Sequence, residues 1–120
     1  MQNKDTAPTA AQTPTQRPIR ERVGLALHGR NAAESLSTII AAEAAGVRQI
    51  WMTQTTPAPD TLGIFAAATV QTSRVRLGTA IVPTYPRHPL ALAQQALTIS
   101  DLAPERLRLG VGPSHRPIIE

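Results

Sequence analysis

The residues of this chain that could take part in chemistry follow its apolar runs. All three histidines do so: His28 and His115 come just after short apolar stretches, and His88 lies in a proline-rich loop behind a third. Their spacing is too wide for a metal site and no carboxylate accompanies them, so we expect no metal centre. No pair of carboxylates suited to acid–base catalysis stands out in the sequence either. A reaction that needs little from side chains, such as hydride or electron transfer by a bound cofactor, suits this set best.

Other common site motifs are missing from the sequence. It contains no cysteine, which excludes disulfides, thiolate metal ligands and cysteine nucleophiles. It also lacks a Walker loop and a G-x-S-x-G elbow. The stretch GVGPSH has two glycines of a dinucleotide fingerprint but neither the third glycine nor the helix that should follow.

A regular alternation of strands and helices positions these residues. Short apolar runs predict strands over 22–29, 47–54, 74–82 and 107–112, and helical periodicity predicts helices over 31–46, 61–72 and 89–102. Asn31 and Asp60 suit helix N-caps, Gly46 suits the position after a helix, and Pro89 suits a first turn. The order predicts right-handed βαβ units and a parallel sheet. A small doubly wound sheet and half of a (βα)8 barrel both begin this way, and in both the functional groups gather at the carboxyl ends of the strands.

Composition limits the class of protein. The chain has 120 residues, 42% hydrophobic and 17% charged, which indicates one small globular domain. Residues 1–20 are rich in Thr, Gln, Ala and Pro and predict a disordered tail before a domain over 21–120. No run suits a membrane span or a signal peptide, so we expect a cytoplasmic protein with no membrane partner. The net charge is +4, but the arginines are scattered without interleaved aromatics, so we expect no nucleic-acid partner.

The stretch VRLGTAIVPTYPRHPLALAQQALTISDLAPERLRLGVGPSH, residues 75–115, resembles the luciferase-like family of flavin and deazaflavin oxidoreductases. The shared features are an LGT strand, a loop ending in RHP, an A-x-Q-A helix and a strand ending in LGxG. The run AAEAAGVRQIWMTQ is similar to the family's first helix and second strand, so the resemblance covers residues 23–120. It implies the N-terminal half of a (βα)8 TIM barrel, with four parallel strands and three helices. The chain would then be truncated, without the later part of the barrel that grips the cofactor phosphate.

The resemblance also implies where a cofactor ring lies. Family members often have a non-prolyl cis peptide at the end of the third strand, where a bulge supports the middle ring of the flavin. The matching bond in this chain joins Ala80 and Ile81. Thr79 would lie beside this bond and face the ring. These three residues are the expected platform of the cofactor.

Residues after the second and fourth strands complete the implied site. Gln54 and Thr55 stand where sugar-phosphate-oxidising relatives carry an Asp-His pair, so we expect no sugar-phosphate dehydrogenation. Gln54 is expected to bond the ring or the substrate instead. Ser114 and His115 follow the fourth strand, where relatives contact cofactor or substrate.

The predicted function is therefore hydride transfer or monooxygenation of a small organic substrate by a luciferase-like oxidoreductase. The deazaflavin coenzyme F420 is favoured as its cofactor, with FMN as the other choice, and no catalytic residue is assigned. Two alternatives remain open. One is an inactive half-barrel that associates through its open edge strands, as a homodimer or with a complementary half. The other is a basic nucleic-acid-binding protein.

Two further expectations concern structure rather than chemistry. A half-barrel leaves inward-facing side chains, expected to be Leu25, Leu77, Thr79, Leu109 or their neighbours, without partners, which predicts marginal stability. For Tyr85, Arg87 and His88 a loop that caps the following helix is the simpler interpretation, with the His88 ring as the cap.

Overall fold

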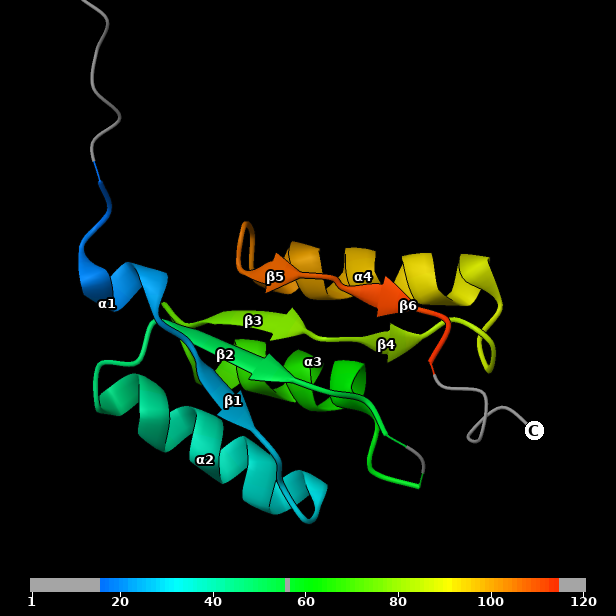
Figure 1. The fold of residues 1–120 in the computed structure, drawn as a ribbon, viewed down its shortest axis with the longest axis horizontal. Helices are drawn as coiled ribbons and strands as arrows, with labels where there is room; N and C mark the ends of the chain where they lie inside the picture. The colour runs from blue at the N-terminus through cyan, green and yellow to red at the C-terminus, as the bar shows by residue number, and fades with distance from the viewer. Residues whose placement is uncertain (1–15, 56, 115–120) are drawn as a thin grey trace, which may run out of the picture.

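The described part of the chain, residues 16–55 and 57–114 in the computed structural model, alternates parallel strands with helices (Figure 1). The helices are α1 (Ile19–Arg22), α2 (Ala32–Ala44), α3 (Thr61–Gln71) and α4 (Pro89–Leu102). The strands are β1 (Leu25–Leu27), β2 (Gln49–Met52), β3 (Arg76–Thr79), β4 (Val82–Pro83), β5 (Leu107–Arg108) and β6 (Val111–Gly112). One parallel sheet has the order β1-β2-β3-β5, and β4 pairs with β6 in a second parallel ladder. The predicted α/β alternation is confirmed.

The helix ends are set by the predicted capping residues. The Asn31 side chain accepts a hydrogen bond from the Glu34 N–H at 2.9 Å, and Asp60 accepts one from the Gly63 N–H at 2.7 Å. Gly46 follows α2 with φ of +93°, a left-handed conformation that glycine adopts without steric cost. At the start of α4, Nδ1 of His88 accepts from the Leu90 N–H at 3.1 Å, which confirms the capping role expected for this ring.

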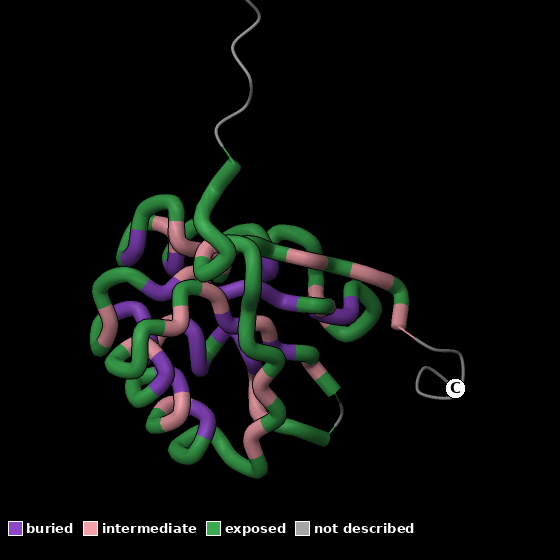
Figure 2. Tube along the Cα trace, turned by 60° about the vertical axis from the view of Figure 1, so that its left-hand side comes forward, coloured by how far each residue is buried: buried purple, intermediate pink, exposed green. Residues whose placement is uncertain are grey.

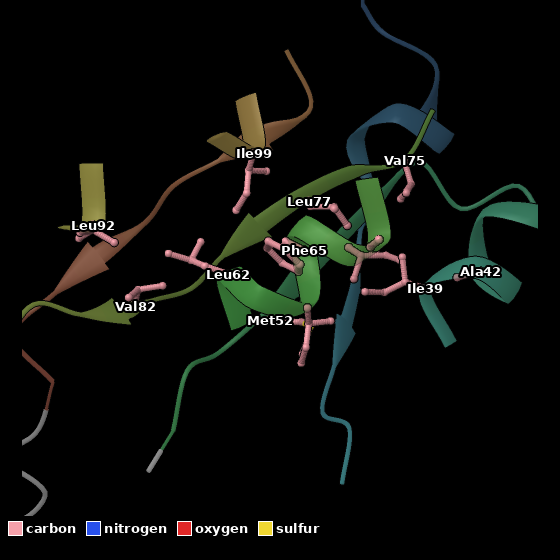
Figure 3. Close-up of a cluster of buried hydrophobic side chains, with 13 residues drawn as sticks. Ile39, Ala42, Met52, Leu62, Phe65, Val75, Leu77, Val82, Leu92 and Ile99 are labelled. Carbon is pink, nitrogen blue, oxygen red and sulfur yellow. The ribbon is translucent and has the colours of Figure 1, made fainter. Parts of the chain in front are cut away.

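The hydrophobic core lies between the sheet and the helices (Figure 3). Ile50 of β2 and Leu77 of β3 are almost fully buried against Ile39, Phe65 and Ile99, which come from α2, α3 and α4. Figure 2 shows the buried segments enclosed by exposed ones. Burying a side chain of this size stabilises the fold by about 1.5–3 kcal/mol. The core therefore fixes the three helices on one face of the sheet.

This arrangement corrects the predicted set of inward-facing residues. Leu77 and Thr79 are each only 1% exposed, because they point toward the helix layer and not toward the open face of the sheet. Leu25 and Leu109 are 39% and 40% exposed and lie on the two outermost strand positions. Side chains alternate between the two faces of a strand. The residues that point toward the open face are therefore the ones adjacent in sequence to these four.

Trp51 occupies the open face of the sheet. A Cβ added to Gly24 would lie 2.8 Å from the indole, and one added to Gly78 would lie 2.4 Å from its six-membered ring. The indole therefore packs on the backbone at Gly24, just before β1, and at Gly78 in β3, and so extends across three neighbouring strand positions. No larger residue fits at Gly78 unless the ring moves.

The third and fourth predicted strands are each divided in two. β3 and β4 are separated at Ala80 and Ile81, and β5 and β6 are separated at Leu109 and Gly110. At this point the Thr79 hydroxyl donates to the Gly110 carbonyl at 2.8 Å and accepts from the Gly110 N–H at 2.8 Å. The Thr79 side chain thus takes the place of backbone-to-backbone bonds between the third and fourth predicted strands at this point. The apolar pattern of the sequence could not indicate this exchange.

Helix α1 crosses the predicted boundary at residue 20. It begins after Pro18, whose carbonyl accepts from the Glu21 N–H at 2.9 Å. The Gln49 side chain donates to the Glu21 carbonyl, which attaches α1 to the start of β2. None of the described helices is long and apolar enough to cross a membrane.

A polar brace joins the amino-terminal ends of the strands to the helices. One Glu43 carboxylate accepts hydrogen bonds from three successive backbone N–H groups, at 3.0 Å from Ser73 and 2.7 Å each from Arg74 and Val75. Burial raises the pKa of Glu43, but these three bonds and the nearby Arg106 charge outweigh it, so the pKa lies below its ordinary value. Arg106 donates to the carbonyls of Val75 and Thr72 at 2.9 Å. Burial lowers the pKa of Arg106 and Glu43 partly offsets this, and an arginine stays protonated in either case.

Candidate functional site

The chain bends at Ala80–Ile81, and the peptide bond between these residues is cis, as the resemblance implied. Backbone and side-chain bonds attach the bend to the end of β2. The Ala80 N–H donates to the Met52 carbonyl at 2.9 Å, and the Ile81 carbonyl accepts from the Gln54 N–H at 3.0 Å. The Thr53 hydroxyl donates to the Ala80 carbonyl at 2.9 Å. The bend is therefore held by the neighbouring strand as well as by its own.

The bend presents a small exposed ledge at the carboxyl ends of the strands. Ala80 and Thr53 are exposed and Ile81 is half-buried. Among the described residues, the Ile81 N–H has no hydrogen-bond partner. The ledge thus offers a methyl group, which a flat ring can contact closely, beside a free backbone donor. We refer to Thr53, Ala80 and Ile81 as the ledge below.

Thr79 does not face this ledge. Its side chain is buried toward the helix layer, and its hydroxyl is occupied by both bonds to Gly110. The expectation that Thr79 faces a ring is therefore wrong in its geometry. Its role in the structure is to connect β3 to the fourth strand position directly below the ledge.

Gln54 closes the loop after β2. Its Oε1 accepts from the Thr61 N–H at 2.6 Å, and its Nε2 donates to the carbonyls of Pro59 at 3.4 Å and Thr55 at 3.3 Å. Together with Asp60 it satisfies the first N–H groups of α3. Its amide is directed into the loop, whereas Thr55 is exposed. The predicted contact of Gln54 with a ring or substrate stays a prediction, and it requires this loop to rearrange.

Ser114 lies just past the end of β6 and is half-buried. Its φ of +67° places a non-glycine residue in the left-handed region, so the chain turns sharply there. β6 pairs with β4, which follows the ledge, so Ser114 lies at the same end of the sheet. The predicted contact of His115 falls outside the described residues.

The loop between β4 and α4 has a structural role. Arg87 forms an ion pair with Asp60 and donates to the Gln95 side chain at 3.0 Å, which connects the loop to α3 and α4. His88 caps α4, and Tyr85 is 43% exposed. The simpler interpretation, a loop that caps the following helix, is confirmed for His88.

Two features of this end of the sheet were missed from the sequence. Thr53 was not assigned from the sequence, although its hydroxyl bonds the ledge, because a threonine after a strand gives no signal of that partner. The Arg87–Asp60 pair joins residues 27 positions apart, which only the fold brings together. Among the described residues, no group of three or more His, Asp or Glu side chains is placed to hold a metal ion.

The alternation of parallel strands and helices is that of a part of a (βα)8-barrel fold. The family model of luciferase-like monooxygenases matches residues 9–120, and the chain belongs to this family. Helices on one face of the sheet and an exposed bend at the carboxyl ends of its strands agree with that assignment.

Two F420-dependent glucose-6-phosphate dehydrogenases are similar in sequence. The one from Tsukamurella paurometabola is 33% identical over 88 residues, which covers 66% of this chain and 26% of that protein. The one from Beutenbergia cavernae is 46% identical over 56 residues, covering 46% of this chain and 17% of that protein. The chain thus spans about a quarter or less of these relatives.

Solved structures show the same fold. The coenzyme F420-dependent tetrahydromethanopterin reductase from Methanopyrus kandleri matches with a TM-score of 0.65 and 26% identity, over 80% of this chain and 28% of that one. The oxygenating constituent of 3,6-diketocamphane monooxygenase from Pseudomonas putida, solved with FMN, matches with a TM-score of 0.69 and 22% identity. That match covers 78% of this chain and 30% of the monooxygenase chain and shows likeness of fold alone.

Proposed function

We propose that this chain supplies the cofactor platform of an oxidoreductase that acts on a small organic substrate with F420 or FMN. The observation that carries the proposal is the ledge, which combines an exposed Ala80 methyl group with a free Ile81 N–H at the carboxyl ends of the strands. When bound, the deazaflavin or flavin ring supplies the hydride or the electron pair. F420 is the favoured cofactor because the similar dehydrogenases are named as F420-dependent.

The ledge residues suit such a ring. The small Ala80 side chain leaves room for an aromatic face, and the Ile81 N–H is a donor for a ring nitrogen or carbonyl. The Thr53 hydroxyl bonds the Ala80 carbonyl and the Gln54 N–H bonds the Ile81 carbonyl, so the backbone of the ledge is held in place before any ligand arrives. A preorganised donor costs less ordering free energy on binding than one in a free loop. Ser114 and His115, after the fourth strand, are proposed as further contacts.

We propose a substrate other than a sugar phosphate. Gln54 and Thr55 stand where the Asp-His pair is expected in sugar-phosphate-oxidising relatives, and neither an amide nor a threonine hydroxyl is an effective base at neutral pH. The amide of Gln54 is also engaged in its own loop. In an assay with glucose 6-phosphate and oxidised F420, the expected result is no loss of the oxidised coenzyme's absorbance. Turnover would overturn this part of the proposal.

Titration with F420 and with FMN tests the platform. We expect the fluorescence of at least one of the two to be quenched or shifted by the chain. Ala80→Phe fills the ledge and should abolish the change. Ala93→Phe, the same substitution at an exposed site on α4, should leave it intact. The absence of any spectral change with both cofactors, or equal binding by Ala80→Phe, would contradict the proposal.

Association through the open edge is a second candidate function. Leu97 of α4 is 65% exposed, and Leu109 and Val111, on the outermost strand position, are 40% and 48% exposed. Leu107, at the same edge of the sheet, packs against the core, so apolar side chains lie both in the core and exposed at this edge. We propose a second copy of the chain or a complementary barrel half as the partner.

Sedimentation velocity tests this candidate. Leu97→Lys should shift a dimer toward monomer, whereas Val70→Lys, at a site on α3 that is 67% exposed, should not. A parent chain that is monomeric at all concentrations would contradict self-association.

A further inference from the structure

A basic depression lies at the amino-terminal ends of β3 and β5. Its volume is about 640 Å³, and its charged lining consists of Arg17, Arg74, Arg76, Arg106, Arg108 and Glu105. These residues come from the segment before α1, the turn that leads into β3 and the turn that leads into β5. Arginines that are scattered in the sequence are therefore gathered in space. The depression contains five guanidinium groups and one carboxylate.

Two of these guanidinium groups are engaged by the protein itself. Arg106 donates to the Thr72 carbonyl at the end of α3 and to the Val75 carbonyl before β3, and it is close to the Glu43 carboxylate. Arg108 donates from Nη1 to the carbonyls of Glu105 at 3.2 Å and Leu107 at 3.1 Å. These neutral acceptors leave its positive charge unpaired.

The side chains of Arg17, Arg74 and Arg76 are the available ones. Within the described residues none of these three guanidinium groups donates a hydrogen bond or forms an ion pair. Glu105 is the only carboxylate in the lining, so the positive charges of the depression exceed the negative ones by four when the five arginines and one glutamate are ionised. Like charges held together raise the free energy of the empty site, and a bound anion relieves that repulsion.

The depression is separate from the ledge. Arg76 begins β3 and Ala80 follows the end of the same strand, so the two sites lie at opposite ends of the sheet (Figure 1). A ring seated at the ledge is therefore not the ligand of the depression. The N–H groups of Ser73, Arg74 and Val75, which line the turn, are already used by Glu43, so side chains must provide the recognition.

We propose that this depression binds a small, multiply charged phosphate ligand, such as a di- or triphosphate group. Guanidinium groups match phosphate oxygens with paired, charge-assisted hydrogen bonds, and several of them converge on one depression. A single-stranded nucleic acid is less suited, because no aromatic side chain that could stack a base is part of the lining. The site extends the function of the chain beyond the proposed cofactor platform and does not depend on it.

Calorimetric titration of the full 120-residue chain with inorganic tripolyphosphate tests the proposal. At low salt we expect saturable binding that weakens as salt is added. Arg74→Gln and Arg76→Gln should each weaken it by about tenfold or more, since hydrogen bonds to charged groups are strong. Arg30→Gln removes the same charge at the opposite end of the sheet, before α2, and should leave the affinity within about twofold.

Each of four results would overturn the proposal. The first is no binding of tripolyphosphate at low salt. The second is an equal loss of affinity in Arg30→Gln, which would indicate net charge alone. The third is binding of a DNA or RNA oligonucleotide that tripolyphosphate does not displace, which would assign the depression to nucleic acid. Circular dichroism of each variant shows whether it is folded, and a folded Arg74→Gln variant that binds like the parent also contradicts the assignment.

Discussion

Replacing Glu43 by glutamine should destabilise the chain, because one carboxylate satisfies three backbone donors. The Ser73, Arg74 and Val75 N–H groups donate to it at 3.0, 2.7 and 2.7 Å. A glutamine of the same shape has only one acceptor oxygen and directs an NH2 group at these donors. Hydrogen bonds to a charged group contribute about 1.5–3 kcal/mol each. The carboxylate is only half-buried, and the glutamine oxygen can still accept some of these hydrogen bonds. We therefore expect the free energy of unfolding to fall by about 2 kcal/mol.

Urea unfolding followed by circular dichroism measures this loss. For a domain of this size the same change lowers the melting temperature by roughly 8–16 °C. Asp101→Asn removes an equal charge from an exposed site on α4 and should change stability by about 0.5 kcal/mol or less. If Glu43→Gln unfolds at the same urea concentration as the parent, or if Asp101→Asn loses as much, the account of the brace is refuted.

The same carboxylate makes stability depend on pH. The pKa of Glu43 is lower in the folded chain than its ordinary value of 4.5, so the unfolded chain binds the proton first as pH falls. The contribution of Glu43 is therefore fully present above that ordinary value and is lost as pH falls through the lower folded pKa. Glu43→Gln lacks this component, so the stability gap between parent and variant should narrow in acid. A gap that is constant or widens on acidification would contradict the direction of the shift.

Three further destabilising substitutions test contacts within the sheet and at the start of α3. Gly78→Ala places a Cβ 2.4 Å from the Trp51 ring, so we expect a loss of about 1–3 kcal/mol and an altered tryptophan emission spectrum; an unchanged spectrum would show that the ring is not there. Thr79→Val keeps the shape but removes both bonds to the Gly110 backbone, so stability should fall by about 1–3 kcal/mol and the Gly110 amide should exchange faster with solvent. Asp60→Ala removes the cap of α3 and its ion pair and should cost about 1–2 kcal/mol in a melting experiment, most of which Asp60→Asn should restore, since asparagine also caps.

The parts of the fold that depend on neighbouring residues were predictable from the sequence. Asn31, Asp60 and His88 each bond an N–H group two or three residues ahead, so the local pattern contains all the information needed. The alternation of apolar runs with helical periods likewise predicted the parallel sheet. The expected bend at Ala80–Ile81 came from the resemblance to the family and not from any physical pattern in those residues.

The parts that depend on distant partners were not predictable in this way. The resemblance implied that Thr79 faces a ring, and the strand pattern did not indicate which face of the strand the helices cover. The bond from the Thr61 N–H to Gln54 was not expected, because this N–H comes close to the side chain only when the loop closes. The basic depression appears only when parallel pairing of β3 and β5 brings Arg76 close to Arg108, 32 residues further along the chain.

Mapping of amide chemical shifts during titration with F420 tests the central claim most directly. The account predicts that the cofactor shifts the amide signals of Thr53, Ile81 and Ser114, at the carboxyl ends of the strands, and leaves those of Arg74 and Arg76 unchanged. The Ile81 N–H should show the largest change, since it is the free donor of the ledge. No shift at the ledge with either F420 or FMN, or shifts confined to the amino-terminal ends of the strands, would contradict the account.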